Sequence, residues 1–351
     1  MKLSRVGSYH VKILLLLLFI CPLAWGKASV VFINPGKAEE SFWQDVDMFA
    51  NAAAKRLALD YRTFHGERNH YSMIKHIEWM INNQQLPDYL MLVNEKQALP
   101  RMLSLLEGQS VYVLVLLNDV SVEQQQLRNN NPHWQNYLLS CIVPNNLWAG
   151  YQTAQSMYLN AEQVTGEAVI ISGDKTTPAS VERTAGAVDF FQHQAGIDLK
   201  QVIYGHWDEQ RSYQQTKVLL KRYPDLKYLW TANDHMAFGS IKAIKELGKQ
   251  PGRDVIVGTV NTSQQALLLR EQGEISALAG GHFTAAGWGL SLIHRHIQGQ
   301  ALPSKVNAPL FVMLQPGTEA FEKVKQKKWD AVMFENMLLE AGNPLSFQFA
   351  Q

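Results

Sequence analysis

The chain has 351 residues, of which 46% are hydrophobic and 18% are charged. This composition provides for a large buried core and excludes a disordered chain, and the length suggests about two domains. The formal net charge is +1 and no run of basic residues stands out. Electrostatics therefore gives little support to a nucleic-acid partner or an anionic membrane surface.

Residues 1–26 have the pattern of a secretory signal peptide. They begin with three basic residues, Lys2, Arg5 and Lys12. The unbroken apolar run Leu14–Ile20 follows, and Ala24 and Gly26 supply small residues for cleavage. Because the apolar run is short for a membrane span, we expect export and removal of this segment. An uncleaved anchor, or a lipid on Cys21, is the alternative.

In the next part of the chain, apolar strand-like runs alternate with segments that have apolar residues at helical spacing. Predicted strands and helices alternate in the order Ser29–Asn34, Glu39–Leu57, Leu59–Phe64, Tyr71–Asn83, Asp88–Val93, Gln97–Glu107 and Val111–Leu117. Residues 118–137 are rich in Asn and Gln and contain Pro132, so they predict a surface loop. A fifth strand, Tyr137–Val143, follows. This alternation is typical of a parallel sheet covered by helices on both faces.

The same pattern starts again with a helix at Leu147–Ala161. The predicted elements that follow are Glu167–Ser172, Ser180–Gln194, Gln201–Tyr204, Glu209–Arg222, Leu226–Thr231, His235–Leu247, Asp254–Val260, Ser263–Glu271, Ile275–Ala279, Thr284–Ile297 and Ala308–Leu314. Two successive α/β units of similar size predict an α/β protein with two doubly wound parallel-sheet lobes.

Five segments, in order along the chain, resemble the type-1 periplasmic binding protein family, which includes the ribose-binding and autoinducer-2-binding receptors. They are Val30–Gly36 with Ser41–Trp43, Leu116–Asp119, Ser180–Gly186, Trp230–Gly239 and Ile256–Asn261. The fourth carries the spacing N-D-x-x-A-x-G, and the third resembles the helix on which the family carries a ligand-binding arginine. The resemblance covers essentially the whole chain after the signal peptide.

This resemblance implies a hinge of three segments between the lobes, near Val143-Pro144, near Gly280-Gly281 and just after Leu314. The N-terminal lobe would consist of residues 27–143 plus 281–314. The C-terminal lobe would consist of residues 144–280 plus 315–351. The carboxyl ends of the strands in both lobes would face a cleft, where open α/β sheets bind their ligands.

The candidate binding residues lie at or just after predicted strand ends. A sugar presents hydroxyl groups and apolar C–H faces, so its site needs polar side chains and flat aromatic walls. The aromatic candidates are Phe42, Trp43 and Trp207. The polar candidates are Asn118, Arg183, Asn233, Asp234 and Asn261. Arg183 would present a planar fork of donors to adjacent hydroxyl groups.

Each candidate also has a structural alternative. Trp43 and Phe42 could belong to the core, and Arg183 could form an ion pair. Asn118 could be a turn residue, and Asn233 could cap the helix that follows, which is compatible with ligand binding. Trp207 could lie in a surface loop. Where the family has a cleft aspartate this chain has Asn261, and Glu40 and His282 are further polar candidates.

The sequence predicts a binding protein without a cofactor or metal. It has no G-x-G-x-x-G after the first strand and no G-x-x-x-x-G-K-[ST], so a phosphate cradle is missing. His294 and His296 are two residues apart on a helix and point apart. A hydrolase would need a clustered nucleophile and base, which the sequence does not provide. We therefore expect no enzymatic activity.

The predicted function is capture of a small polar ligand, a sugar, by hinge closure of a periplasmic monomer. The closed form would deliver the ligand to an ABC permease. The alternative is a receptor role in chemoreception or signalling, in which the closed form binds a membrane sensor kinase or cyclase. The sequence does not separate these two membrane partners.

We expect the mature protein to begin at Lys27, because Ala24 and Gly26 follow the apolar run. The intact mass of the protein from a periplasmic fraction measures this directly. A mass that includes residues 1–26, or a diacylglycerol on Cys21, would contradict the prediction.

Overall fold

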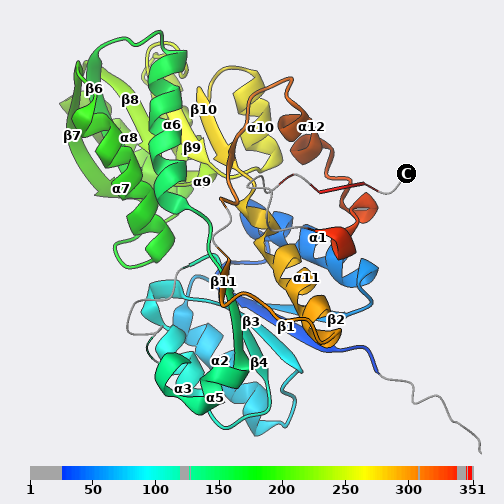
Figure 1. Cartoon of the computed structure of the whole chain (residues 1–351). Helices are drawn as coiled ribbons and strands as arrows, with labels where there is room; N and C mark the ends of the chain where they lie inside the picture. Colours follow the sequence, from blue (N-terminus) through cyan, green and yellow to red (C-terminus); the bar gives the residue numbers. More distant parts are fainter. Residues whose placement is uncertain are drawn as a thin grey trace, which may run out of the picture.

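The computed structural model describes residues 26–118, 126, 128–306, 309–337, 345 and 347–349. They form two lobes, each built on a six-stranded sheet (Figure 1). The strand orders are β11-β5-β4-β3-β1-β2 and β12-β10-β9-β8-β6-β7. The first sheet is parallel throughout, and the second has one antiparallel edge strand, β12. The predicted α/β fold of two doubly wound lobes is confirmed. Residues 1–25, most of the predicted signal peptide, lie outside the described residues.

The N-terminal lobe is built around central strands such as β1, in which Val30–Ile33 are buried. Its strands are β1 (Ser29–Asn34), β2 (Asp60–His65), β3 (Tyr89–Val93), β4 (Tyr112–Leu116), β5 (Leu138–Ile142) and β11 (Lys305–Val306). Its helices are α1 (Ser41–Arg56), α2 (His70–Asn82), α3 (Leu99–Leu106), α5 (Pro132–Tyr137) and α11 (Ala285–Ile297). Helices α1 and α11 pack together, as do α2 and α3 (Figure 1).

The C-terminal lobe repeats this arrangement. Its strands are β6 (Gly166–Ser172), β7 (Ile197–Tyr204), β8 (Leu226–Thr231), β9 (Ile256–Val260), β10 (Ala277–Gly280) and β12 (Val312–Met313). Its helices are α6 (Asn146–Asn160), α7 (Pro178–His193), α8 (Glu209–Arg222), α9 (Asp234–Glu246), α10 (Gln264–Glu271) and α12 (Glu319–Gln326). Within the described residues, no helix combines the length and the apolar character that a membrane crossing requires.

Helices α6 and α7 approach each other closely because each has a glycine at the contact. A Cβ atom on Gly150 would lie 1.9 Å from the carbonyl oxygen of Arg183. A Cβ atom on Gly186 would lie 2.0 Å from the carbonyl oxygen of Leu147. Real Cβ atoms do not approach backbone atoms this closely, so α7, which carries Arg183, is seated directly on α6.

The prediction of a surface loop at residues 118–137 is wrong for the C-terminal part of this range, where the chain forms helix α5. The side chain of Asn131 accepts a hydrogen bond from the backbone N–H of His133, and Pro132 is the first helical residue. Both are favourable at a helix N-terminus. Trp134, with 1% of its surface exposed, attaches this short helix to the core.

The chain crosses from the first sheet to the second before Leu314 and not after it. The late strand predicted at Ala308–Leu314 is present only as β12, which pairs with β10 of the second sheet, and the last strand of the first sheet is β11, which pairs with β5 and precedes the predicted range. Residues 307 and 308 lie outside the described residues. Helix α12, which the sequence analysis did not predict, follows and is capped by the side chain of Thr318.

The C-terminal segment then returns to the N-terminal lobe, which differs from the predicted assignment of residues 315–351 to the C-terminal lobe. Trp329 and Phe334 pack edge-to-face on Phe49 of α1, with ring centroids 5.3 and 5.1 Å away. The carboxylate of Asp45, also on α1, accepts hydrogen bonds from Thr262 Oγ1 at 3.0 Å and from Lys327 Nζ. Asp45 therefore binds the C-terminal lobe and the returning segment at once.

Replacing Phe49 with Ala removes the ring on which the C-terminal segment packs. We expect Phe49→Ala to lower the free energy of unfolding by about 3–5 kcal/mol, as for other buried aromatics. Met48→Ala is the matched control, because Met48 precedes Phe49 on α1 and is 43% exposed. It should change stability by no more than about 0.5 kcal/mol. Urea unfolding measures both variants, and equal losses would contradict the assignment.

Candidate functional site

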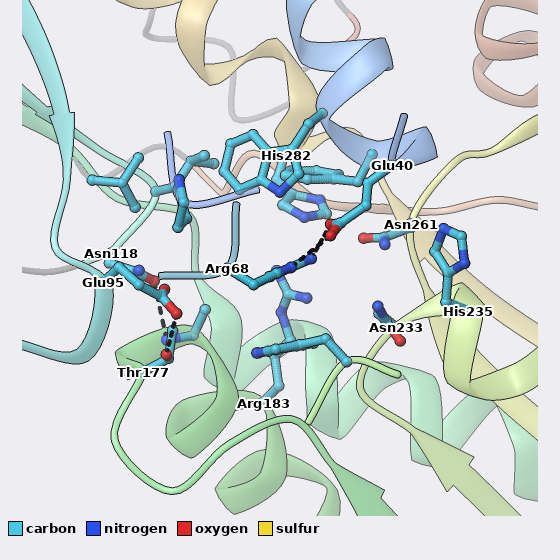
Figure 2. Close-up of a pocket in the computed structure, with 17 residues that line it drawn as sticks. Glu40, Arg68, Glu95, Asn118, Thr177, Arg183, Asn233, His235, Asn261 and His282 are labelled. Carbon is cyan, nitrogen blue, oxygen red and sulfur yellow. Dashed lines mark hydrogen bonds and ion pairs between the residues drawn. The ribbon is translucent and has the colours of Figure 1, made fainter. Parts of the chain in front are cut away.

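A cavity lies between the two lobes, at the carboxyl ends of the strands (Figure 2). Its empty volume, including the open mouth, is about 620 Å³. The structure brings seven of the eight predicted residues into its lining: Phe42, Trp43, Asn118, Arg183, Trp207, Asn233 and Asn261. Asp234 lies behind the lining. Whether these residues bind a ligand stays a prediction.

Trp43 belongs to the core and to the cavity wall. It is 5% exposed, and its ring lies 6.3 Å from that of Phe32. Its indole lies against Gly36, where a Cβ atom would come within 1.8 Å of Trp43 Cδ1. The buried Nε1–H has no hydrogen-bond partner among the described residues. Trp43 therefore presents an apolar face and an open donor.

Trp207 forms a wall from the other lobe. Its indole covers Gly173, where a Cβ atom would lie 2.3 Å from Trp207 Cζ2. Its Nε1–H donates to Asp174 Oδ2 at 3.2 Å. Burial raises the pKa of the Asp174 carboxyl, but hydrogen bonds from Thr176, Thr177 and Trp207 outweigh it and hold that pKa below its ordinary value. The ring is thus fixed by a carboxylate outside the lining.

A stack of three rings closes one side of the cavity. The imidazole of His282 lies between Phe42 and Phe311, with ring centroids 4.5 Å away on each side. His282 is 3% exposed, and its Nδ1 has no hydrogen-bond partner among the described residues. Burial, and secondarily the nearby charge of Arg183, places the pKa of His282 well below its ordinary value. The ring is therefore neutral at pH 7.

Arg183 extends from α7 into the cavity (Figure 2). It is 5% exposed, and its guanidinium lies 5.4 Å from the centre of the Phe311 ring. Nε donates to Asn146 Oδ1 at 2.9 Å, and Nη1 donates to the carbonyl oxygen of Ala232 at 3.1 Å. Burial lowers the pKa of Arg183 to about 10, so the group still carries its charge at pH 7. These contacts fix the orientation of the fork of donors.

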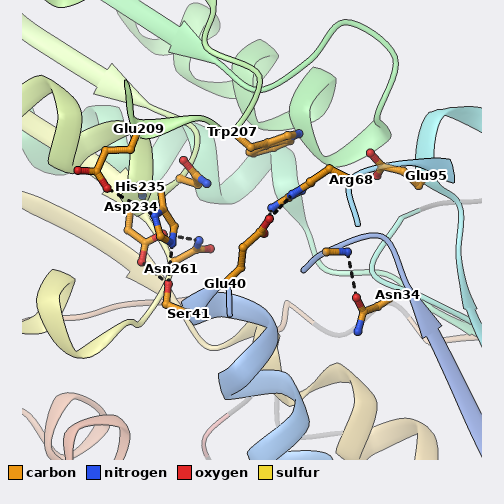
Figure 3. Close-up of polar contacts among 12 residues, drawn as sticks. Asn34, Glu40, Ser41, Arg68, Glu95, Trp207, Glu209, Asp234, His235 and Asn261 are labelled. Carbon is orange, nitrogen blue, oxygen red and sulfur yellow. Dashed lines mark hydrogen bonds and ion pairs between the residues drawn. The ribbon is translucent and has the colours of Figure 1, made fainter. Parts of the chain in front are cut away.

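Asn233 is held by the local backbone, and Asn261 is held by Asp234 (Figure 3). Asn233 caps α9, because its Oδ1 accepts from the N–H of Met236 at 3.0 Å. The fully buried carboxylate of Asp234 accepts from Asn261 Nδ2 at 2.8 Å and from Ser263 Oγ. Asn261 has φ of 113°, a strained value of the kind that clusters at binding sites. The structure therefore makes Asp234 a positioning residue for Asn261.

Polar contacts join the lobes across the cavity. Oδ1 of Asn118 accepts from the backbone N–H of Ala179 at 3.2 Å, at the start of α7. Thr177 Oγ1 donates to Glu95 Oε1 at 3.1 Å. Ser41 Oγ lies 3.1 Å from Nε2 of His235 (Figure 3). The lobes are therefore closed on each other in this structure.

Several lining residues were missed by the sequence analysis, and the main ones are Arg68, Glu95 and Thr177. The carboxylate of Glu40 accepts two hydrogen bonds from the guanidinium of Arg68, one from Nε at 2.8 Å and one from Nη2 (Figures 2 and 3). Arg68 follows β2 and Glu95 follows β3. The sequence analysis looked for binding residues just after predicted strands. Applied to every strand, the same criterion selects both Arg68 and Glu95.

The carboxyl group of Glu95 is almost completely buried in the wall of the cavity. It is 4% exposed, and burial raises its pKa to about 7, with a smaller contribution from the negative charge of Asp174. The charge of Arg68 and the hydrogen bond from Thr177 act in the opposite direction. The Glu95 carboxyl therefore gains or loses its proton near neutral pH, far above the range of an exposed glutamate.

Fold and site together define a two-lobed α/β protein with a small-molecule cavity at facing strand ends. A profile of the periplasmic binding protein domain matches residues 30–301. The chain therefore belongs to the periplasmic binding protein family, as the resemblance predicted. Members of this family are solute-binding proteins, which agrees with the expectation of no enzymatic activity.

Two curated relatives match part of the chain. The D-ribose/D-allose-binding protein of Pseudomonas aeruginosa is 32% identical over 117 residues, which is 33% of this chain and 36% of that protein. The D-allose-binding periplasmic protein of Escherichia coli is 30% identical over 112 residues, 32% of this chain and 35% of that protein. The matches thus span about a third of these relatives.

Solved structures resemble the chain over most of its length. A periplasmic sugar-binding protein from Pseudomonas fluorescens has a TM-score of 0.78 and 30% identity, covering 88% of this chain and 93% of its own. A periplasmic solute-binding protein from Actinobacillus succinogenes has a TM-score of 0.73 at 17% identity, covering 86% of this chain and 100% of its own. At 17% identity, the similarity to the Actinobacillus succinogenes protein concerns the fold alone.

Glu95→Gln should change how stability depends on pH. Because the pKa of Glu95 is about 7 in the folded chain and about 4.5 ordinarily, the protonated carboxyl stabilises the fold. That contribution is complete below pH 4.5 and is lost as the pH rises through 7. The free-energy difference between wild type and Glu95→Gln should fall by on the order of 3 kcal/mol between pH 4.5 and 8.

Urea unfolding of both proteins across this pH range measures the difference. His282 titrates in the opposite sense, because its buried neutral form stabilises the fold above pH 6.5 and this is lost as the pH falls. It is present in both proteins and cancels. Glu162→Gln, at an exposed position, is the control. Parallel pH curves for wild type and Glu95→Gln would contradict the prediction.

Proposed function

We propose that this chain captures a sugar in the cavity between its lobes and, in the periplasm, delivers it to a membrane permease of the ABC type. The observation that carries the proposal is the composition of the cavity. Aromatic walls from both lobes, Trp43 and Trp207, face an oriented fork of donors on Arg183. Aromatic faces suit the C–H surfaces of a sugar ring, and planar donors suit adjacent hydroxyl groups.

The relatives support a carbohydrate ligand. The Pseudomonas aeruginosa and Escherichia coli relatives are named for binding D-ribose or D-allose. The Actinobacillus succinogenes structure is that of an ABC transporter protein with bound D-allose. The contacts that close the lobes, from Asn118 to Ala179 and from Glu95 to Thr177, support release by separation of the lobes.

A thermal-shift screen of pentoses, hexoses and their furanose forms tests the function. A sugar at a hundred times its dissociation constant should add about 2.7 kcal/mol to the free energy of unfolding. For the best ligand, we expect Arg183→Ala to weaken binding by about 1.5–3 kcal/mol, because a charge-assisted hydrogen bond is lost. That is roughly ten- to a hundredfold in affinity, measured by calorimetry.

Val181→Ala is the matched control, because Val181 lies on the same helix, is 50% exposed and is absent from the cavity lining. It should bind like wild type. Trp43→Ala should weaken binding and also cost stability, since the indole is part of the core. A folded Arg183→Ala protein that binds the sugar with wild-type affinity would contradict the proposed role of Arg183. If no sugar in the screen stabilises the protein, the proposed sugar-binding function is contradicted.

A further inference from the structure

Within the part of the chain that the structure describes, the positive charge of Arg183 has no negatively charged partner in direct contact. Four residues of the described lining carry a formal charge: Glu40, Arg68, Glu95 and Arg183. Glu40 and Arg68 neutralise each other in their two-bond ion pair. Glu95, on the far side of Arg68, is buried and accepts a hydrogen bond from Thr177 Oγ1. The guanidinium of Arg183 is therefore left without a carboxylate in hydrogen-bond contact among the described residues.

The groups that do bind Arg183 are neutral. They are an amide oxygen, on Asn146, and a backbone oxygen, on Ala232. The carboxylates of Glu182 and Asp234 act on Arg183 only through longer-range attraction. Asp234 is already bound by Asn261 and Ser263. Nε and one N–H of Nη1 are used, so the second N–H of Nη1 and both N–H groups of Nη2 are left for a ligand.

The open hydrogen-bonding groups around Arg183 are mostly donors. Trp43 Nε1–H is buried without a partner. Asn233 uses its oxygen to cap α9, so its Nδ2 is the group that remains. Asn261 uses its Nδ2 on Asp234, and its oxygen is the acceptor that remains. A ligand that satisfies this set must supply mainly acceptors. An ionised carboxylate supplies acceptors only, whereas each hydroxyl group also brings a donor that needs a partner of its own.

We propose that the ligand of this cavity is a sugar acid, a uronate or an aldonate, whose carboxylate binds the open edge of Arg183 beside His282. The inference rests on the proposed sugar-binding function and narrows its ligand class. A planar carboxylate fits the guanidinium fork, and charge-assisted hydrogen bonds are about twice as strong as neutral ones. The neutral ring of His282 adds no competing charge and can donate one further hydrogen bond.

Calorimetry at pH 7 on the mature protein tests the proposal with matched ligands. The probes are D-galacturonate, D-glucuronate and D-gluconate, the uncharged amide of each acid, and the parent sugars D-galactose and D-glucose. Each acid and its amide have nearly the same shape, so their affinity ratio isolates the charge. We expect at least one acid to bind about tenfold or more tightly than its amide and its parent sugar.

Arg183→Gln should reduce the ratio of acid to amide affinity to about one, and Arg183→Lys should retain part of it. Melting curves establish that each variant is folded. Where Arg183→Gln does not fold, the wild-type ratio and Arg183→Lys decide. A parent sugar or amide that binds as tightly as the acid would overturn the proposal and leave sugar binding intact. An acid preference unchanged in folded Arg183→Gln would also overturn it. Absence of binding by every acid and every neutral sugar would overturn both proposals.

Discussion

The guanidinium of Arg183 is held between the lobes with 5% of the residue exposed. Taking this charge out of water is costly, so the surrounding chain must supply partners for its donors. Gly150 and Gly186 let α7 sit directly on α6, which places Asn146 beside the guanidinium. Phe311 covers it from the hinge side. The packing of α7 on α6, the amide of Asn146 and the ring of Phe311 thus all stabilise the buried charge of Arg183.

That charge also determines what its neighbours can be. His282 must be neutral, because burial and the guanidinium both disfavour a second positive charge. On the opposite side, burial and the negative charge of Asp174 across the lobe boundary raise the pKa of Glu95 to about 7. The cleft therefore contains several titratable groups whose charge depends on whether the lobes are together.

Strand ends could be predicted from the sequence, because apolar runs of strand length alternate with amphipathic helices. Polar residues just after those runs, such as Asn118 and Asn261, therefore fell in one cavity. Pairing between side chains could not be predicted in this way. The ion pair of Glu40 and Arg68 joins two loops, and the role of Asp234 depends on a neighbour 27 residues away.

The position of the C-terminal segment could not be predicted from the sequence for a related reason. Trp329 and Phe334 show no strand or helix periodicity, and they are placed by packing on Phe49, which lies far away in the sequence. Helix α5 is likewise held by the burial of Trp134. In both places tertiary contacts, and not local pattern, decide the structure.

Asp45 has a mechanical consequence for lobe motion. Its carboxylate joins α1 of one lobe to Thr262 of the other and to Lys327 of the returning segment, and none of the three residues lines the cavity. A rotation that separates Asn118 from Ala179 while these bonds persist must turn about an axis close to Asp45. Under that constraint the lobes stay in contact on the Asp45 side while the mouth of the cavity widens.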